Sequence, residues 1–267
     1  RSKAAAFIGT LQASYTNFHY LRDIWTQTTE KEALIGVSMT GIASGNVLKL
    51  NMPEAARVVK EENERAAKLF GIRKAARTTT IKPEGTSSLV LGSSSGIHAW
   101  HNDYYIRRLR VGKDEAIYGY LSEHHPELVV DEFFKPNQQA VIEVPQRAPT
   151  GAITRQESAL QLLTRVKDVW SGWVRTGHRK GENRNNVSTT VTIKDDEWGA
   201  VSEWMWENRN VYTALCVLPH TDHSYVQSPF EDIDEETYNE TVGSLTEINL
   251  DNVVELKDET HLQAELA

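Results

Sequence analysis

Cysteine is almost absent from this sequence: its 267 residues include only Cys216, with 3 methionines and 8 prolines. One cysteine cannot form an intramolecular disulfide or a cysteine-rich zinc site. Positive charge is scarce as well, because 29 Lys and Arg face 37 Asp and Glu, and a net negative chain is ill suited to non-specific duplex binding. The longest apolar runs, such as 212–218, are too short to cross a bilayer. These absences predict a soluble cytoplasmic protein that binds neither nucleic acid nor membrane.

The rest of the composition is that of a globular protein. Hydrophobic residues make up 39% of the chain, and 7 Trp, 9 Tyr and 6 Phe supply enough apolar surface to exclude general disorder. The chain begins at Arg1 without Met and ends at Ala267 without a clear stopping feature. We therefore expect a fragment or one half of a split protein.

The hydrophobic pattern predicts alternating helices and strands. Helices are expected near residues 53–70, 154–177, 195–208 and 234–242, and strands near 35–43, 78–82, 140–144, 187–193 and 211–218. Pro53 and Gly71 suit the two ends of the first helix, and Thr154 with Glu157 forms the capping-box pattern at the start of the second. The strand–helix–strand order over 187–218 favours helices packed outside a largely parallel sheet or barrel. We expect one α/β domain over residues 1–226 and an acidic C-terminal arm over 227–267.

The segment from Thr78 to Ser88 is the richest in candidate chemistry. A β-branched strand ends, Pro83 forces a turn, Gly85 permits unusual torsion angles, and Thr86, Ser87 and Ser88 open the next element. A helix N-terminus of this kind offers free backbone N–H groups and hydroxyls to a phosphate. The alternative is a plain helix cap with incidental hydroxyls, since the Walker pattern is absent. A second small-residue cluster, 92–98, follows four residues after Ser88. Two such clusters around one short element favour a loop that faces a ligand over a plain helix cap.

The other candidate residues point less clearly to a binding or catalytic site. The basic aromatic stretch 104–110 could contact phosphate, or its arginines could pair with the abundant acids. His124–His125 and His220-x-x-His223 match no zinc motif, so no metal site is predicted. Cys216 lies in an apolar run, which predicts a buried, inert thiol rather than a nucleophile. The tryptophans at 170, 173, 198, 204 and 206 have helical spacing and are expected to pack helices.

Taken together, the motifs resemble class II ribonucleotide reductases. The matching segments are collinear and cover nearly the whole chain: 7–16, 36–42, Lys82-Pro83-Glu84-Gly85-Thr86-Ser87-Ser88, 96–98, 105–108, 186–191, 218–220 and 227–231. The resemblance implies the C-terminal part of a ten-stranded α/β barrel with helices outside. It also implies that the substrate's phosphates bind at the turn formed by Glu84, Gly85, Thr86, Ser87 and Ser88, with Glu84 supplying backbone.

The same resemblance implies an enzyme that converts ribonucleotides to deoxyribonucleotides with adenosylcobalamin, on a diphosphate or, by family likeness, a triphosphate. The family's thiyl-radical cysteine would lie before Arg1 and its tail cysteine pair after Ala267, and Cys216 matches none of these cysteines. The chain alone is therefore not expected to reduce nucleotides. Its implied partners are an N-terminal reductase chain or segment and a thioredoxin-type reductant. The alternative is a non-catalytic nucleotide-binding or regulatory module derived from that fold.

Overall fold

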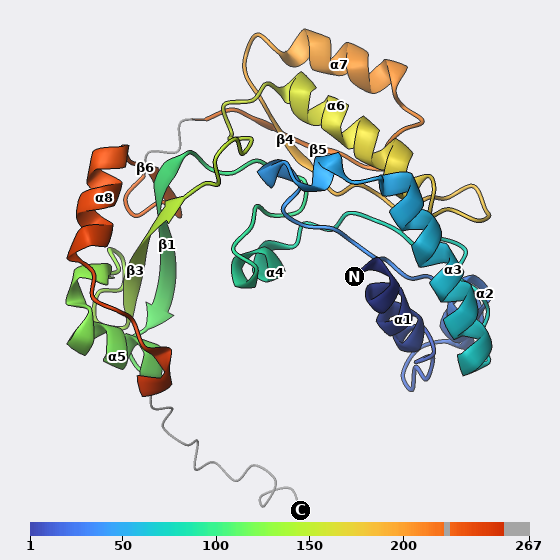
Figure 1. The fold of residues 1–267 in the computed structure, drawn as a ribbon, viewed down its shortest axis with the longest axis horizontal. Helices are drawn as coiled ribbons and strands as arrows, with labels where there is room; N and C mark the ends of the chain where they lie inside the picture. The colour runs from blue at the N-terminus through green and yellow to red at the C-terminus, as the bar shows by residue number, and fades with distance from the viewer. Residues whose placement is uncertain (222–224, 254–267) are drawn as a thin grey trace, which may run out of the picture. The chain divides into compact units, whose positions relative to one another are not determined.

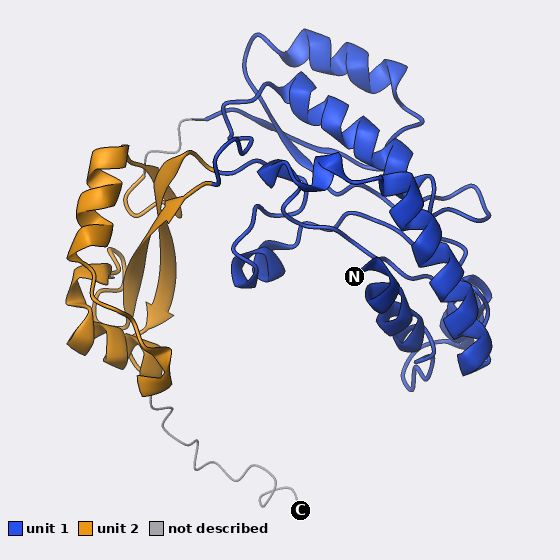
Figure 2. Ribbon diagram, viewed as in Figure 1, with its two compact units in different colours: residues 1–100, 149–221 blue, residues 101–148, 222–267 orange. Residues whose placement is uncertain are grey.

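A computed structural model describes residues 1–221 and 225–253 (Figure 1). The chain forms two compact units, each built from two separate stretches (Figure 2). Unit 1 comprises residues 1–100 and 149–221, and unit 2 comprises residues 101–148 and 222–267. None of the helices in the described ranges is both long and apolar enough to span a membrane.

Unit 1 contains a parallel arrangement of extended segments. Strands β4 (Thr190–Ile193) and β5 (Cys216–Pro219) pair in parallel, with Thr190 opposite Cys216. Two single parallel bridges continue this arrangement, one between Ile81 and Val187 and the next between Val37 and Thr79. The order across the sheet is therefore 35–37, 78–81, 187–193 and 216–219. Helix α7 (Trp198–Glu207) connects β4 to β5, so the predicted strand–helix–strand unit is confirmed.

Helices pack around this sheet, and α1, α3 and α6 with its continuation supply most of the hydrophobic core. They are α1 (Ser2–Gln12), α2 (Asp23–Glu32), α3 (Met52–Phe70), the short α4 (Gly85–Val90) and α6 (Ala159–Val169), which continues as a π-helical turn over Trp170–Val174. Val59 of α3, Leu163 of α6 and Trp173 of the π-helical turn are almost completely buried in one cluster. Figure 1 shows α6 and α7 on one side of β4 and β5, with α4 on the other.

Local capping residues set the ends of α3 as predicted, whereas the predicted start of α6 is wrong. Asn51 caps α3 by accepting from the Glu54 amide, and Gly71 ends it with φ 69°, as Pro53 and Gly71 predict. Helix α6 does not begin at Thr154. Its cap is Ser158, which forms a capping box with Gln161. The sequence contains two consecutive patterns of this type, and the Glu157 carboxylate of the first pairs with the buried Arg165 instead of a backbone amide at Thr154.

Unit 2 is a four-stranded antiparallel sheet with strand order β2-β3-β1-β6. Its elements are β1 (Tyr104–Gly112), α5 (Ala116–His124), β2 (Val129–Asp131), β3 (Gln139–Arg147), β6 (Phe230–Asp232) and α8 (Glu235–Ser244). A separate core of Val111, Tyr120, Leu128 and Ala140 stabilises this unit. Because β6 pairs with β1 and α8 contacts β3, residues 225–253 belong to a compact unit. The division of the structure thus differs from a boundary at residue 226 followed by a trailing arm.

Candidate functional site

The turn after the 78–81 segment has the local structure expected of a helix N-terminus. Glu84 adopts a left-handed conformation with φ 57° and immediately precedes α4. The Ser88 amide donates to the Glu84 carbonyl at 3.0 Å, so the amides of Gly85, Thr86 and Ser87 precede the repeating hydrogen bonds of the helix. These three residues are exposed.

The hydroxyls of the turn have different surroundings. Ser87 Oγ donates to the Glu84 carboxylate at 2.6 Å. Ser88 Oγ donates to the Gly85 carbonyl at 3.2 Å, and Ser88 is only 3% exposed. The structure therefore presents Gly85, Thr86 and Ser87 to solvent, whereas Ser88 supports the turn from inside.

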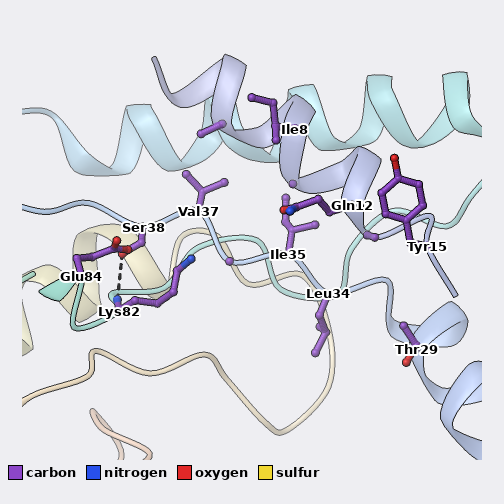
Figure 3. A pocket seen from close by; sticks show the side chains of 14 residues that line it. Ile8, Gln12, Tyr15, Thr29, Leu34, Ile35, Val37, Ser38, Lys82 and Glu84 are labelled. Atoms are coloured by element: carbon purple, nitrogen blue, oxygen red, sulfur yellow. Dashed lines mark hydrogen bonds between the residues drawn. The ribbon is translucent and has the colours of Figure 1, made fainter. Parts of the chain in front are cut away.

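A cavity of about 600 Å³ lies beside this turn (Figure 3). Lys82 and Glu84 line one end, the 36–38 segment lines its middle, and α1 contributes Gln12 and its neighbours. The backbone amide of Lys82 donates to Ser38 Oγ at 3.0 Å, which joins the two extended segments at the cavity. Lys82, whose ammonium is a natural partner for phosphate, was not among the predicted site residues. Its position one residue before the proline of the turn is the signal that could have identified it.

The second small-residue cluster, 92–98, packs directly on the first. Gly96 has φ 56°, and a Cβ there would lie 2.6 Å from the Lys82 carbonyl oxygen. Ser95 Oγ donates to the Pro83 carbonyl. The Gly96 amide donates to Thr40 Oγ1 at 3.0 Å, and Thr40 Oγ1 donates to the Ser94 carbonyl at 3.0 Å. Glycine is required at position 96 because the backbones of the two loops lie too close together for a side chain between them.

A buried ion pair anchors this loop from α6. Arg165 is 6% exposed and forms two hydrogen bonds with the Glu157 carboxylate, at 2.6 and 2.7 Å. Its Nε and Nη2 also donate to the Ile97 carbonyl at 3.4 and 3.3 Å. Burial lowers the pKa of the neighbouring His98, which favours the neutral imidazole near the turn.

The arginines of the basic aromatic stretch form ion pairs within unit 2. On β1, Arg108 pairs with Glu143 and Glu231, and Arg110 lies 3.5 Å from Glu132, as the ion-pair alternative predicts. No group of three or more His, Cys, Asp or Glu side chains able to hold a metal ion occurs within residues 1–221 and 225–253. His220 is exposed, and His223 lies outside the described residues.

One prediction about apolar residues is wrong and another holds in part. Cys216, the first residue of β5, is exposed rather than buried, whereas Trp204 packs against the core as expected. Trp198 and Trp206 on α7 are 39% and 72% exposed, whereas Trp170 and Trp173 are buried as expected. Helical spacing placed all five tryptophans on helices or their continuations, but it could not show which face each helix buries.

Comparison with known proteins confirms the predicted resemblance over most of the chain, although no family model matches it. A relative from Dictyostelium discoideum, named "probable adenosylcobalamin-dependent ribonucleoside-triphosphate reductase", is 28% identical over 249 residues, which is 84% of this chain and 30% of the relative. The adenosylcobalamin-dependent ribonucleoside-triphosphate reductase of Euglena gracilis is 25% identical over 84% of this chain and 31% of the relative. The reductase of the same name from Lactobacillus leichmannii is 27% identical over 71% of this chain and 25% of the relative.

The fold agrees with these relatives. The crystal structure of a B-12 dependent (class II) ribonucleotide reductase superimposes with a TM-score of 0.77 and 20% identity, covering 91% of this chain and 38% of that one. The chain thus spans about a third or less of the length of the named relatives. The mixed α/β class predicted from the sequence is confirmed.

Proposed function

We propose that this chain is the substrate-holding part of a ribonucleotide reductase, an oxidoreductase that replaces the 2′-hydroxyl of a ribonucleotide by hydrogen. The observation that carries the proposal is the turn at Glu84–Ser88, which exposes three successive helix-start amides beside a cavity. Collinear similarity to proteins named ribonucleoside-triphosphate reductases favours a triphosphate substrate.

The parallel segments support a place for the chain in a ten-stranded barrel. Four adjacent segments run in parallel within unit 1, and the phosphate turn follows the carboxyl end of one of them. Ligands of parallel α/β sheets bind at this end of the strands. Unit 1, residues 1–100 and 149–221, would thus form most of one half of the barrel, and a separate N-terminal chain or segment would complete it.

At the turn, the amides of Gly85, Thr86 and Ser87 would donate to phosphate oxygens, as helix N-termini do for anions. Ser87 would turn its hydroxyl from the Glu84 carboxylate to the phosphate, and the Lys82 ammonium at the cavity would offset the added negative charge. Glu84 would contribute its left-handed backbone rather than its carboxylate. Holding the phosphates in this way would orient the ribose for reaction.

The relatives are named as adenosylcobalamin-dependent, and we propose the same cofactor for the complete enzyme, where it would supply the radical when bound. The cavity of about 600 Å³ beside Lys82 is of the size that accommodates a small ligand. It does not fit a corrin macrocycle, so no step of the reaction is assigned to the cofactor in this cavity. Cys216 alone cannot supply the two electrons of the reduction, and we propose that a thioredoxin-type reductant and cysteines outside this chain do so.

Isothermal titration of the purified chain with a ribonucleoside triphosphate tests the phosphate site. Ser87→Ala removes one hydroxyl donor, and Lys82→Met removes the nearby charge. Each is expected to weaken binding about tenfold to a hundredfold, because a hydrogen bond to a charged group contributes about 1.5–3 kcal/mol.

Ser122→Ala on α5 is the matched control, since Ser122 Oγ also donates within its own helix but lies in unit 2. Affinity unchanged in both test variants would place the phosphates elsewhere. Nucleotide reduction by the chain mixed with a partner carrying the radical cysteine would support the enzyme over a purely nucleotide-binding module.

A further inference from the structure

His98 closes the second small-residue loop, and both of its ring nitrogens have partners. Nε2 accepts from the Thr190 backbone amide at 3.0 Å. Nδ1 lies 3.1 Å from the Ser95 carbonyl oxygen. An amide N–H can only donate and a carbonyl can only accept, so Nδ1 must carry the proton and Nε2 must be unprotonated. This pair of contacts requires one tautomer of the neutral ring.

The Thr190 amide donates to His98 rather than to the neighbouring extended segment, whose Pro83 carbonyl accepts from Ser95 instead. The Ile81 amide donates to the Asn186 carbonyl, and the Ser188 amide donates to the Ile81 carbonyl, which is the alternation of a parallel ladder. The next groups in this ladder would be those of Pro83 and Thr190. Pro83 has no N–H, and its carbonyl accepts from Ser95 Oγ. The imidazole of His98 therefore takes the place of a strand carbonyl opposite Thr190.

We propose that His98 is a positioning residue for the phosphate turn, holding the 92–98 loop against β4 so that this loop fixes the backbone of Pro83. The proposal rests on the function proposed above. The loop touches the turn at two backbone positions, through Ser95 and through Gly96. Pro83 directly precedes Glu84, so a displaced loop would also displace the amides that follow Glu84.

Charged groups from a neighbouring element face His98. Burial has the largest effect on the pKa of His98 and lowers it, and the hydrogen bond with the Ser95 carbonyl raises it. Arg165 of α6 then lowers the pKa and Glu157 raises it. The net lowering of the His98 pKa keeps Nε2 unprotonated near neutral pH. Protonation in acid would place an N–H against the Thr190 N–H, so the contact would be lost as the pH falls through the pKa of His98 in the folded chain.

Two substitutions separate the contacts of the ring. His98→Gln keeps an acceptor near the position of Nε2, and His98→Asn keeps a donor near the position of Nδ1. The probe is inorganic tripolyphosphate, titrated calorimetrically into the full chain, with circular dichroism to monitor folding. We expect His98→Asn to weaken binding about tenfold, because the Thr190 amide loses its acceptor, and His98→Gln to stay within about threefold of the unchanged chain.

The outcomes distinguish the two proposals. If the unchanged chain does not bind tripolyphosphate, the proposed function fails, and the role of His98 fails with it. If the unchanged chain binds and His98→Asn binds equally well, or if both variants lose affinity equally, only the role of His98 is overturned. Should His98→Asn not fold, the pH profile decides. Affinity of the unchanged chain must fall relative to His98→Gln on acidification, and a constant ratio would refute the coupling.

Discussion

Removing the guanidinium of Arg165 tests how far the buried ion pair stabilises unit 1. Arg165 and Glu157 have side chains only 6% and 10% exposed, and two charge-assisted hydrogen bonds join them. Arg165→Met keeps much of the side-chain volume but leaves the Glu157 carboxylate buried without its partner. Breaking a buried pair in this way costs about 3–5 kcal/mol. The Ile97 carbonyl would lose its two guanidinium contacts as well.

This cost is a large fraction of the stability of a typical domain, which is about 5–15 kcal/mol. With a denaturant dependence of about 2 kcal/mol per molar urea, the unfolding midpoint is expected to fall by about 1.5–2.5 M. The assay is urea unfolding followed by tryptophan fluorescence, since Trp170 and Trp173 lie on the continuation of α6 and are buried in unit 1.

Arg57→Met is the matched control, because Arg57 pairs with Glu54 on α3 while both side chains are about half exposed. An exposed pair contributes about 0–1 kcal/mol, so its midpoint should change little. Adding Glu157→Gln to Arg165→Met removes the unpaired charge and should recover part of the loss. If Arg165→Met destabilises no more than Arg57→Met, or if the double variant recovers nothing, the attribution of stability to this ion pair is refuted.

Two further changes concern packing and protonation in unit 1. Gly96→Ala should destabilise by about 2 kcal/mol or more, because a left-handed alanine costs about 1 kcal/mol and its Cβ would meet the Lys82 carbonyl. Gly71 is also left-handed but has open space around it. Gly71→Ala should therefore lower the free energy of unfolding only by the backbone cost of about 1 kcal/mol in the same urea experiment. The hydrogen bond from Arg65 lowers the pKa of the buried Glu62 carboxylate, so its stabilisation is complete above pH 4.5 and is lost as the pH falls through the folded pKa. Glu62→Gln should flatten that part of the stability profile, and an equally steep acid limb in the variant would contradict this origin.

Local signals predicted the elements whose ends depend on local chemistry. Helix α3 begins and ends where Pro53 and Gly71 indicate, since a proline suits the first turn and a glycine the left-handed residue after the last. The start of α6 could not be chosen in the same way. Both Thr154 and Ser158 begin a capping-box pattern, and the choice depends on a contact outside the pattern, because Glu157 is bound by Arg165, eight residues further along the chain.

Unit 2 was beyond local sequence reasoning because its sheet joins distant segments. Strand β1 pairs with β6, and Arg107 lies opposite Phe230. The acidic composition after Gln227 suggested a solvated arm, yet Glu231 pairs with Arg108 of β1. The same contact favours the ion-pair interpretation of this stretch over the phosphate one. Arg108 pairs with Glu143 and Glu231, and Arg110 with Glu132, carboxylates that only the folded sheet brings near.

The candidate site itself follows from where a parallel ladder is interrupted. Pro83 can offer a carbonyl but no N–H, so pairing between the 78–81 segment and 187–193 cannot continue past it. The chain must then leave the sheet within one or two residues, and Glu84 does so in a left-handed conformation that opens α4. The Pro83 carbonyl and the Thr190 amide, which would pair with each other in a continued ladder, are instead bonded by the 92–98 loop, through Ser95 and His98 respectively. A strand that continued would use its own amides in the sheet, whereas here residues 85–87 are exposed, which leaves their amides open to the phosphate in the proposed function.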